Sequence, residues 1–246
     1  MRIVVNHLTR MRHGHICVAG LNLANGLHVR PLPRTDLLYR DLAAHGGLFE
    51  IGAVLDLGWT KFIGKAPEVE DHEFWRKNAR PVDDLPPAKF WSLLKADAKP
   101  TLIDIFGPDL RPVGHDRAAV DAGHGRVSLG TLLVTQQPPE LFIESHQPRD
   151  RIRLRLKTGR IPLSVPVTDI RLYGLDHMTP DPAAVERAQE RLRTSAEVIL
   201  TVGLSRAYSD WLSDQPERHW LQVNNLHFVE EPYWRLPVGP DPMSAE

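Results

Sequence analysis

Apolar and polar residues alternate in many short runs along the chain, which is the pattern of half-buried β-strands. Several runs are rich in β-branched residues, and turn-forming residues separate them. The dipeptide Asn25-Gly26 stands between two of the runs and indicates a hairpin. The segments that we predict as strands are 2–5, 15–21, 27–31, 53–59, 129–136, 141–145, 151–157, 160–167, 170–173, 198–204 and 219–229.

Helical spacing of apolar residues is found in only two segments. Residues 88–96 follow Pro86-Pro87, and a proline pair suits the start of a helix. Residues 183–195 form the clearer helix, because Asp181 can cap it, Pro182 fits its first position, and its apolar residues fall on one face. The sequence therefore predicts a mainly β protein with few helices.

The order of elements, several strands followed by a helix, occurs twice. The polar stretch from Pro108 to Gly125 is rich in glycine and proline and separates the two occurrences. We therefore predict two domains, residues 1–125 and 126–246, each a small OB-type β-barrel in tandem with the other. A single β-sandwich with added elements is the alternative fold.

Composition excludes several classes of protein. The chain has 246 residues, 42% hydrophobic and 25% charged, with a net charge of −1, which argues against disorder and against a collagen-like repeat. Cys17 is the only cysteine, so a disulfide scaffold is excluded and a reducing compartment is expected. We find no signal peptide and no apolar run of about 20 residues, so we expect a cytoplasmic protein with no membrane contact.

The net charge conceals two basic segments. Residues 1–40 contain six arginines and one acidic residue, and residues 149–171 contain seven basic residues and two acidic ones, so each segment carries a charge of +5. A chain that is neutral in total can therefore present basic surfaces to an anionic partner.

The second basic segment contains a strand with strictly alternating chemistry. Ile152, Leu154 and Leu156 alternate with basic residues, so all the charges point to one face. Side chains on one face repeat at about 6.6–6.8 Å, a spacing that suits the backbone of an extended nucleic-acid strand. The alternative is an edge strand that its charges protect from aggregation. The basic positions are Arg151, Arg153, Arg155 and Lys157.

The first basic segment supplies further candidates for phosphate contact, namely Arg10, Arg12 and Arg30. Arg30 could instead form a buried ion pair, for example with Asp56. Single-strand binding also needs aromatic rings on which bases stack, although most aromatic residues are expected in the core. We choose the two that adjoin a basic residue near a strand end: Trp59 beside Lys61, and Tyr208 beside Arg206.

The predicted strand 219–229 carries an unusual set of polar residues: His219, Gln222, Asn224 and His227. Buried amides and imidazoles need partners, either from neighbouring strands or from a ligand. They are the alternative candidate site, a polar pocket of an enzyme that acts on a nucleotide or nucleic acid. His13 and His15, or His115 with its neighbours, have no metal-site spacing, so no metal or other cofactor is expected, and Cys17 is expected to be a buried thiol.

Several short motifs carry a family resemblance. His7-Leu8-Thr9-Arg10, the run from Gly14 to Leu21, and His28-Val29-Arg30-Pro31 resemble bacterial proteins with a dual OB domain. The segments 49–54, 67–72, 199–206 and 219–227 extend the resemblance over nearly the whole chain. It implies two tandem OB-type barrels and a nucleic-acid or nucleotide role, but no catalytic residues.

These observations together predict a tandem OB-fold protein that binds single-stranded nucleic acid or a nucleotide. The alternatives are the enzyme described above and a module that binds another protein. The sequence specifies neither an enzyme class nor an oligomeric state.

Overall fold

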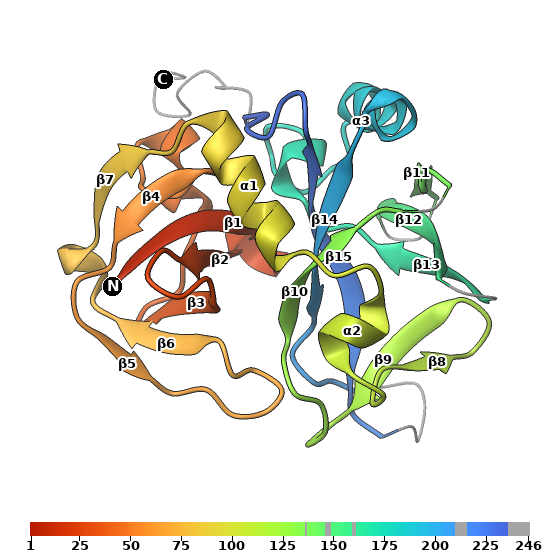
Figure 1. The fold of residues 1–246 in the computed structure, drawn as a ribbon, viewed down its shortest axis with the longest axis horizontal. Coiled ribbons are helices and arrows are strands. Elements are labelled where there is room, and N and C mark those ends of the chain that lie inside the picture. Colours follow the sequence, from red (N-terminus) through yellow and green to blue (C-terminus); the bar gives the residue numbers. More distant parts are fainter. Residues whose placement is uncertain (136, 146–148, 159–160, 210–215, 236–246) are drawn as a thin grey trace.

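The computed structural model describes residues 1–135, 137–145, 149–158, 161–209 and 216–235 (Figure 1). This part of the chain is mainly β with few helices, as predicted. Among its helices, none is long and apolar enough to cross a membrane.

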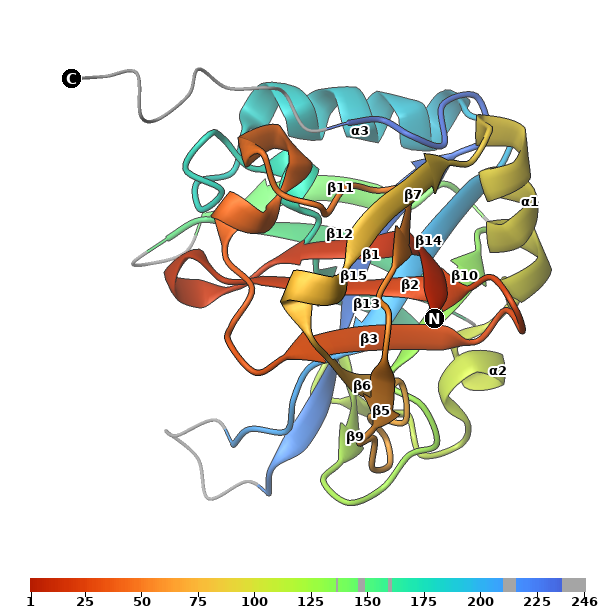
Figure 2. The ribbon, with the colours of Figure 1, turned by 90° about the vertical axis from the view of Figure 1, so that its left-hand side faces the viewer.

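The first half of the chain forms a curled sheet of seven strands (Figures 1 and 2). The dipeptide Asn25-Gly26 joins β2 to β3 in the predicted hairpin, and Gly26 has a φ of 73°, which glycine adopts readily. β3 and β6 are parallel, with Arg30 opposite Asp71. In spatial order the strands are β5 (Thr60–Phe62), β6 (Asp71–Phe74), β3 (His28–Pro33), β2 (Ile16–Asn22), β1 (Arg2–Arg10), β4 (Ala53–Asp56) and β7 (Arg80–Asp84).

The remainder of the chain, from residue 102 on, contains two more sheets, and we call it the second half. The larger has the order β10 (Leu129–Leu133), β14 (Val198–Leu204), β15 (Arg218–Phe228), β9 (Arg117–Asp121) and β8 (Arg111–Val113). The smaller has the order β11 (Glu140–Glu144), β12 (Arg151–Thr158) and β13 (Ile161–Pro166). The hairpin of β8 and β9 lies inside the stretch 108–125, which we predicted only as a separator without strands of its own, so that prediction is wrong.

Both predicted helices are present, and α2 (Leu102–Phe106) is an addition. α1 (Pro87–Asp97) lies over the curled sheet, and α3 (Pro182–Thr194) lies at the far side of the second half (Figure 1). Asp181 caps α3 by accepting hydrogen bonds from the amides of Ala183 and Ala184. The 3-10 turns are η1 (Arg12–Gly14), η2 (Tyr39–Asp41), η3 (Ala43–His45), η4 (Arg76–Asn78) and η5 (Ile170–Leu172).

Buried apolar residues form two clusters, one for each half of the chain. The first lies between the curled sheet and α1, and it also takes in Ile170 and Ile199 from the second half. The second fills the space between the two other sheets and α3, and it begins at Leu102. Buried apolar residues from Leu102 onward therefore pack mainly in the second cluster, although the predicted boundary lies at residue 125. The domain boundary at residue 125 stays a prediction.

Candidate functional site

The strand with alternating basic residues is β12, and its two faces are as predicted. Ile152, Leu154 and Leu156 are buried in the second cluster. The basic side chains lie on the opposite face, where Arg153 is half-buried and the others are exposed. β12 is the central strand of its sheet, so the interpretation as a protected edge is wrong.

Acidic residues on the neighbouring strand β11 face this basic row. Glu140 stands opposite Arg155 and Glu144 opposite Arg151, and Arg155 forms an ion pair with Glu140. The Nε atom of Arg153 lies 3.9 Å from a carboxylate oxygen of Glu144. The row is therefore partly neutralised across the strands, which weakens the field that it presents to a phosphate backbone.

Arg30, in contrast, lies inside the molecule. Its side chain is 6% exposed, and its Nε atom donates to a carboxylate oxygen of Asp71 at 2.6 Å. Its Nη2 atom donates to the Ser128 hydroxyl at 3.1 Å. Asp56 is not its partner, since that carboxylate faces the amino group of Met1 at 3.5 Å. A ligand outside the protein cannot reach Arg30, so we leave it out of the binding surface.

The other two arginines of the first segment lie near the end of β1. The guanidinium of Arg10 lies over the ring of Tyr173, 4.8 Å from its centroid. Arg12 is exposed in η1. Arg10 is therefore engaged with an aromatic ring of the second half, and Arg12 extends into solvent.

Arg206 connects the two halves of the chain. Its Nη2 atom donates to Asp71 at 2.6 Å, and its Nη1 atom lies 3.5 Å from Glu68. Asp71 thus accepts from Arg30 on one oxygen and from Arg206 on the other. Tyr208, two residues further on, is 52% exposed. This ion-pair network fixes the segment that carries Tyr208 beside β6.

The polar residues of β15 pack against β1. The Nδ2 atom of Asn224 donates to Nδ1 of His7 at 3.0 Å, and Gln222 donates to Asn224 at 3.0 Å. Nε2 of His227 is 3.2 Å from the Asn6 carbonyl oxygen. The fourth residue, His219, is 4% exposed and close to the Ser205 carbonyl. Asn224 and His227 therefore connect β15 to β1, and with it the two halves.

Burial sets the protonation state of the histidines in this contact. Burial, followed by the charge of Arg171, lowers the pKa of His227 from 6.5 to about 3. Burial, followed by the neighbouring His28, lowers the pKa of His7 well below its usual value. Both imidazoles are therefore neutral at pH 7.

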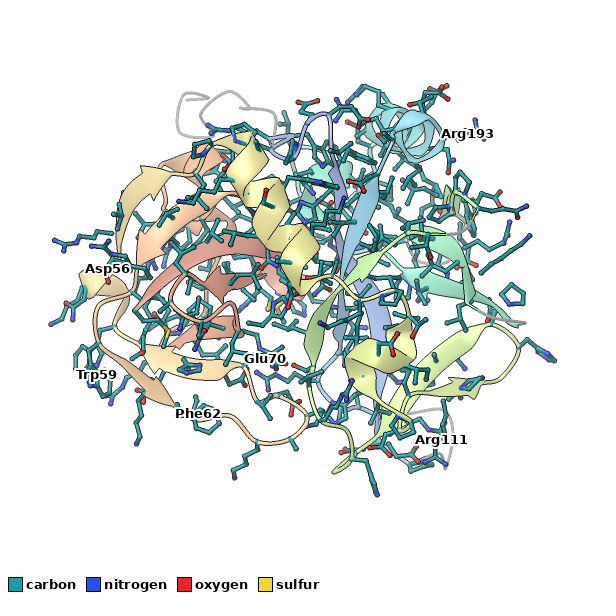
Figure 3. The ribbon with its side chains drawn as sticks, viewed as in Figure 1. Asp56, Trp59, Phe62, Glu70, Arg111 and Arg193 are labelled. Carbon is teal, nitrogen blue, oxygen red and sulfur yellow. The ribbon has the colours of Figure 1, made fainter. Side chains whose placement is uncertain are left out.

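Exposed aromatic rings gather on one edge of the first sheet. Trp59 is 55% exposed, Phe62 58% and Trp75 41%, and Trp59 and Phe62 point outward at the β5 side (Figure 3). The sequence selected Trp59 and did not select Phe62 or Trp75, because most aromatic residues were expected in the core and a short polar strand gives no alternation that would show which side its rings face. We call the margin of the sheet formed by residues 59–62 and 71–77 the aromatic edge.

Cations accompany these rings. Lys61 is exposed on β5, between Trp59 and Phe62 in the sequence. The guanidinium of Arg34 lies 5.2 Å from the centre of the Trp75 ring, and the ammonium of Lys77 lies 5.1 Å from it. Glu73 accepts from Nε of Arg34 at 2.7 Å and stands opposite Lys61 on β6, so it compensates part of this charge. The aromatic edge therefore combines exposed rings with partly compensated positive charge.

Among the described residues, the geometry indicates neither a metal-binding site nor a reactive thiol. Within the described residues, no three or more His, Cys, Asp or Glu side chains are placed to hold a metal ion. Cys17 is half-buried, and burial raises the pKa of its thiol. A thiol with a raised pKa is a poor nucleophile at neutral pH.

No model of a known protein family matches the chain, and no curated protein matches it either. The resemblance to dual OB domain proteins therefore stays a prediction, and the function is argued from the surfaces described above.

Proposed function

We propose that the protein binds single-stranded nucleic acid on the aromatic edge, and that its curled sheets are OB-type barrels. The observation that carries the proposal is the distribution of exposed rings. Among the described residues, the aromatic side chains with large exposure are Trp59, Phe62, Trp75 and Tyr208. Three of them share the aromatic edge, and Arg206 ties the segment of the fourth to β6.

Stacking supplies most of the binding energy in this proposal. Every base has an apolar face, so a ring that remains exposed in the free protein is a platform for any base. Burying such a ring against a base contributes about 1–3 kcal/mol. Lys61 and Lys77 attract the phosphates between stacked bases. Since these contacts read no base edges, we expect little sequence preference.

A second group of rings and cations extends the proposed binding surface for the nucleic-acid strand into the second half. Tyr208 lies 6.3 Å from Trp220 between ring centroids, and Arg117 lies over the Trp220 ring at 4.5 Å. β5 and β6 lie at the lower left of Figure 1, and β9, which carries Arg117, lies at the lower right. A strand that starts on the aromatic edge would continue along this lower side toward Tyr208.

The basic row of β12 has a lesser role in this proposal. Its sheet lies away from the aromatic edge, on the other side of the molecule in Figure 1. Glu140 and Glu144 already compensate part of its charge. We assign to it long-range attraction and no direct contact with stacked bases.

The test is the affinity for a fluorescein-labelled oligothymidylate of 12 nucleotides, measured by fluorescence anisotropy at low salt. We expect Trp59→Ala and Phe62→Ala each to weaken binding by about 5- to 150-fold, the range that corresponds to one stacked base. Lys61→Gln should make the slope of log affinity against log salt shallower by about 0.7. Leu27→Ala is the matched control, since Leu27, just before β3, is 65% exposed but has no ring.

Two results would contradict the proposal in different ways. If the unmodified chain shows no affinity for the oligonucleotide at low salt, the function is wrong. If it binds, but only Arg151→Gln with Lys157→Gln weakens binding, the function stands and the site is the β12 row instead.

A further inference from the structure

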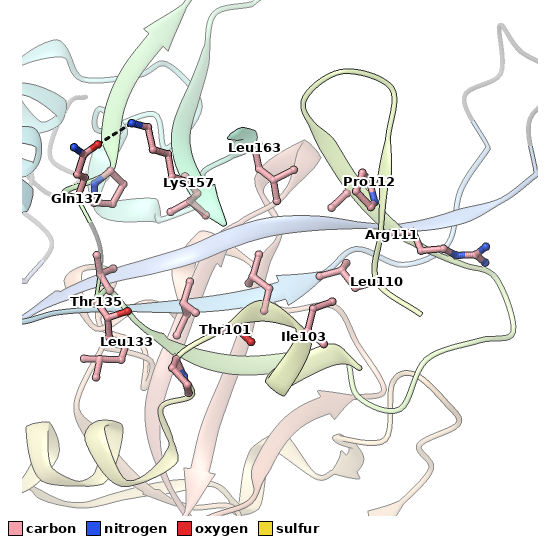
Figure 4. Close-up of a pocket in the computed structure, with 17 residues that line it drawn as sticks. Thr101, Ile103, Leu110, Arg111, Pro112, Leu133, Thr135, Gln137, Lys157 and Leu163 are labelled. Atoms are coloured by element: carbon pink, nitrogen blue, oxygen red, sulfur yellow. Dashed lines mark hydrogen bonds between the residues drawn. The ribbon is translucent and has the colours of Figure 1, made fainter. Parts of the chain in front are cut away.

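A cavity opens between the two sheets of the second half (Figure 4). α2 and β10 form one wall, β12 and β13 form another, and the start of β8 closes a third side. Its volume is about 390 Å³. Protein interiors are normally packed without voids of this size, and ligand pockets begin at about 300 Å³. The cavity is therefore large enough to take a small molecule.

The walls of the cavity are apolar. Leu102, Leu132, Leu156 and Leu163 line its inside, and each of these side chains is also part of the second hydrophobic cluster. Ile103, which also lines the cavity, is 51% exposed and thus lies where the cavity meets solvent. An apolar surface of this shape favours an apolar ligand body over water.

The charged groups that line the cavity are both positive. They are Arg111 and Lys157, and no aspartate or glutamate is found among the described residues that line the cavity. Arg111 is already compensated by Asp121, whose carboxylate accepts from its Nη2 atom at 2.8 Å. The Nζ atom of Lys157 donates to the neutral Gln137 amide oxygen at 2.7 Å (Figure 4). Lys157 is therefore the group that an incoming anion would meet.

We propose that this cavity binds a small amphipathic carboxylate, an aromatic ring system or short alkyl chain that ends in one acidic group. The apolar body occupies the space between α2 and β13, and the carboxylate replaces Gln137 as the partner of Lys157. A charge-assisted hydrogen bond is stronger than the neutral one that it replaces. The site is separate from the aromatic edge, so it adds a second ligand to the proposed function.

The probe is 2-naphthoate, which carries one carboxylate on an apolar bicyclic ring, and its neutral counterpart is 2-naphthalenemethanol. Isothermal titration calorimetry on the full chain should show binding of 2-naphthoate, with the alcohol about tenfold weaker, the difference expected of one charge-assisted hydrogen bond. Lys157→Gln should remove this preference. Arg155→Gln is the matched control, since Arg155 precedes Lys157 on the same face of β12 but does not line the cavity.

Two further variants test the location. Ala118→Phe fills the cavity from inside and should abolish binding. Since this variant could also disturb folding, Ile103→Trp provides an independent block at the exposed mouth, where a larger side chain costs little stability.

Three outcomes would overturn the proposal. The first is no binding of either probe to the unmodified chain. The second is equal affinity for the acid and the alcohol, which would refute the role of Lys157. The third is unchanged binding in both Ala118→Phe and Ile103→Trp, which would place the probe elsewhere.

Discussion

The ion pair between Asp169 and Arg171 lies in the contact between the two halves and has no exposed surface on either side chain. The guanidinium of Arg171 donates to both carboxylate oxygens, at 2.9 Å through Nε and 2.7 Å through Nη2. The same guanidinium donates to the carbonyl oxygens of Leu226 and Trp234, and it lies 4.3 Å from the centre of the Trp234 ring. The partners of this cation are thus a carboxylate, two carbonyl oxygens and the face of an aromatic ring, all of which stabilise a positive charge.

Replacing Asp169 with asparagine keeps the shape of the side chain and removes its charge. The Arg171 cation would then be buried without a counter-charge, and breaking a buried pair in this way costs about 3–5 kcal/mol. We therefore expect Asp169→Asn to lower the free energy of unfolding by about 4 kcal/mol. The double variant Asp169→Asn with Arg171→Met should cost less than the sum of the two single changes, because it leaves no unpaired charge.

Urea unfolding followed by tryptophan fluorescence measures this change. With a slope of about 3 kcal/mol per molar urea, a loss of 4 kcal/mol moves the midpoint down by about 1.3 M. Asp181→Asn makes the same chemical change at the N-cap of α3, where asparagine caps as well as aspartate, and should leave the midpoint nearly unchanged. A midpoint shift of less than about 0.3 M for Asp169→Asn would show that the buried ion pair contributes little to stability.

Other predictions concern stability. His227 has a low pKa in the folded chain, so below pH 6.5 the unfolded chain binds a proton that the folded chain does not. The free energy of unfolding should therefore fall by up to about 1.4 kcal/mol for each unit by which the pH is lowered toward 3. The urea midpoint of His227→Gln should fall less steeply over the same range. Asp181→Ala removes the cap of α3 and should cost about 1 kcal/mol in urea unfolding. Gly203→Ala places a β-carbon 2.6 Å from Asn224 Nδ2, so it should lower the melting temperature, whereas Gly174→Ala should not.

The parts of the fold that depend on neighbours in the sequence could be predicted. α3 begins where Asp181 and Pro182 place it, because capping is a local interaction. The faces of β12 follow from strict alternation over seven residues. The hairpin at Asn25-Gly26 follows from the conformations that these residues prefer.

The parts that depend on distant residues could not be predicted. β5 and β6 have only three and four residues, and they are strands because β6 pairs with β3. The partner of Arg30 was missed because Asp71, 41 residues away, reaches it only through that parallel pairing. Trp75 directly follows β6, so the exposure of its side chain could not be predicted when β6 itself was not predicted.

The β15 residues show a mixed result. The sequence correctly identified polar side chains that need partners, and the hydrogen bond from Gln222 to Asn224 places both amides together as expected. It left open whether those partners are neighbouring strands or a ligand. The structure supplies partners from β1, which is more than 200 residues away along the chain.

Photocrosslinking can locate single-stranded nucleic acid on the surface of the protein and thus tests whether it binds at the aromatic edge. An oligothymidylate with one 4-thiothymidine is irradiated with the full chain, and the linked peptides are identified by mass spectrometry. We expect crosslinks within residues 59–77, with Trp59, Phe62 or Trp75 as the attached residue. Crosslinks confined to residues 151–157, or no crosslinked peptide at low salt, would contradict this expectation.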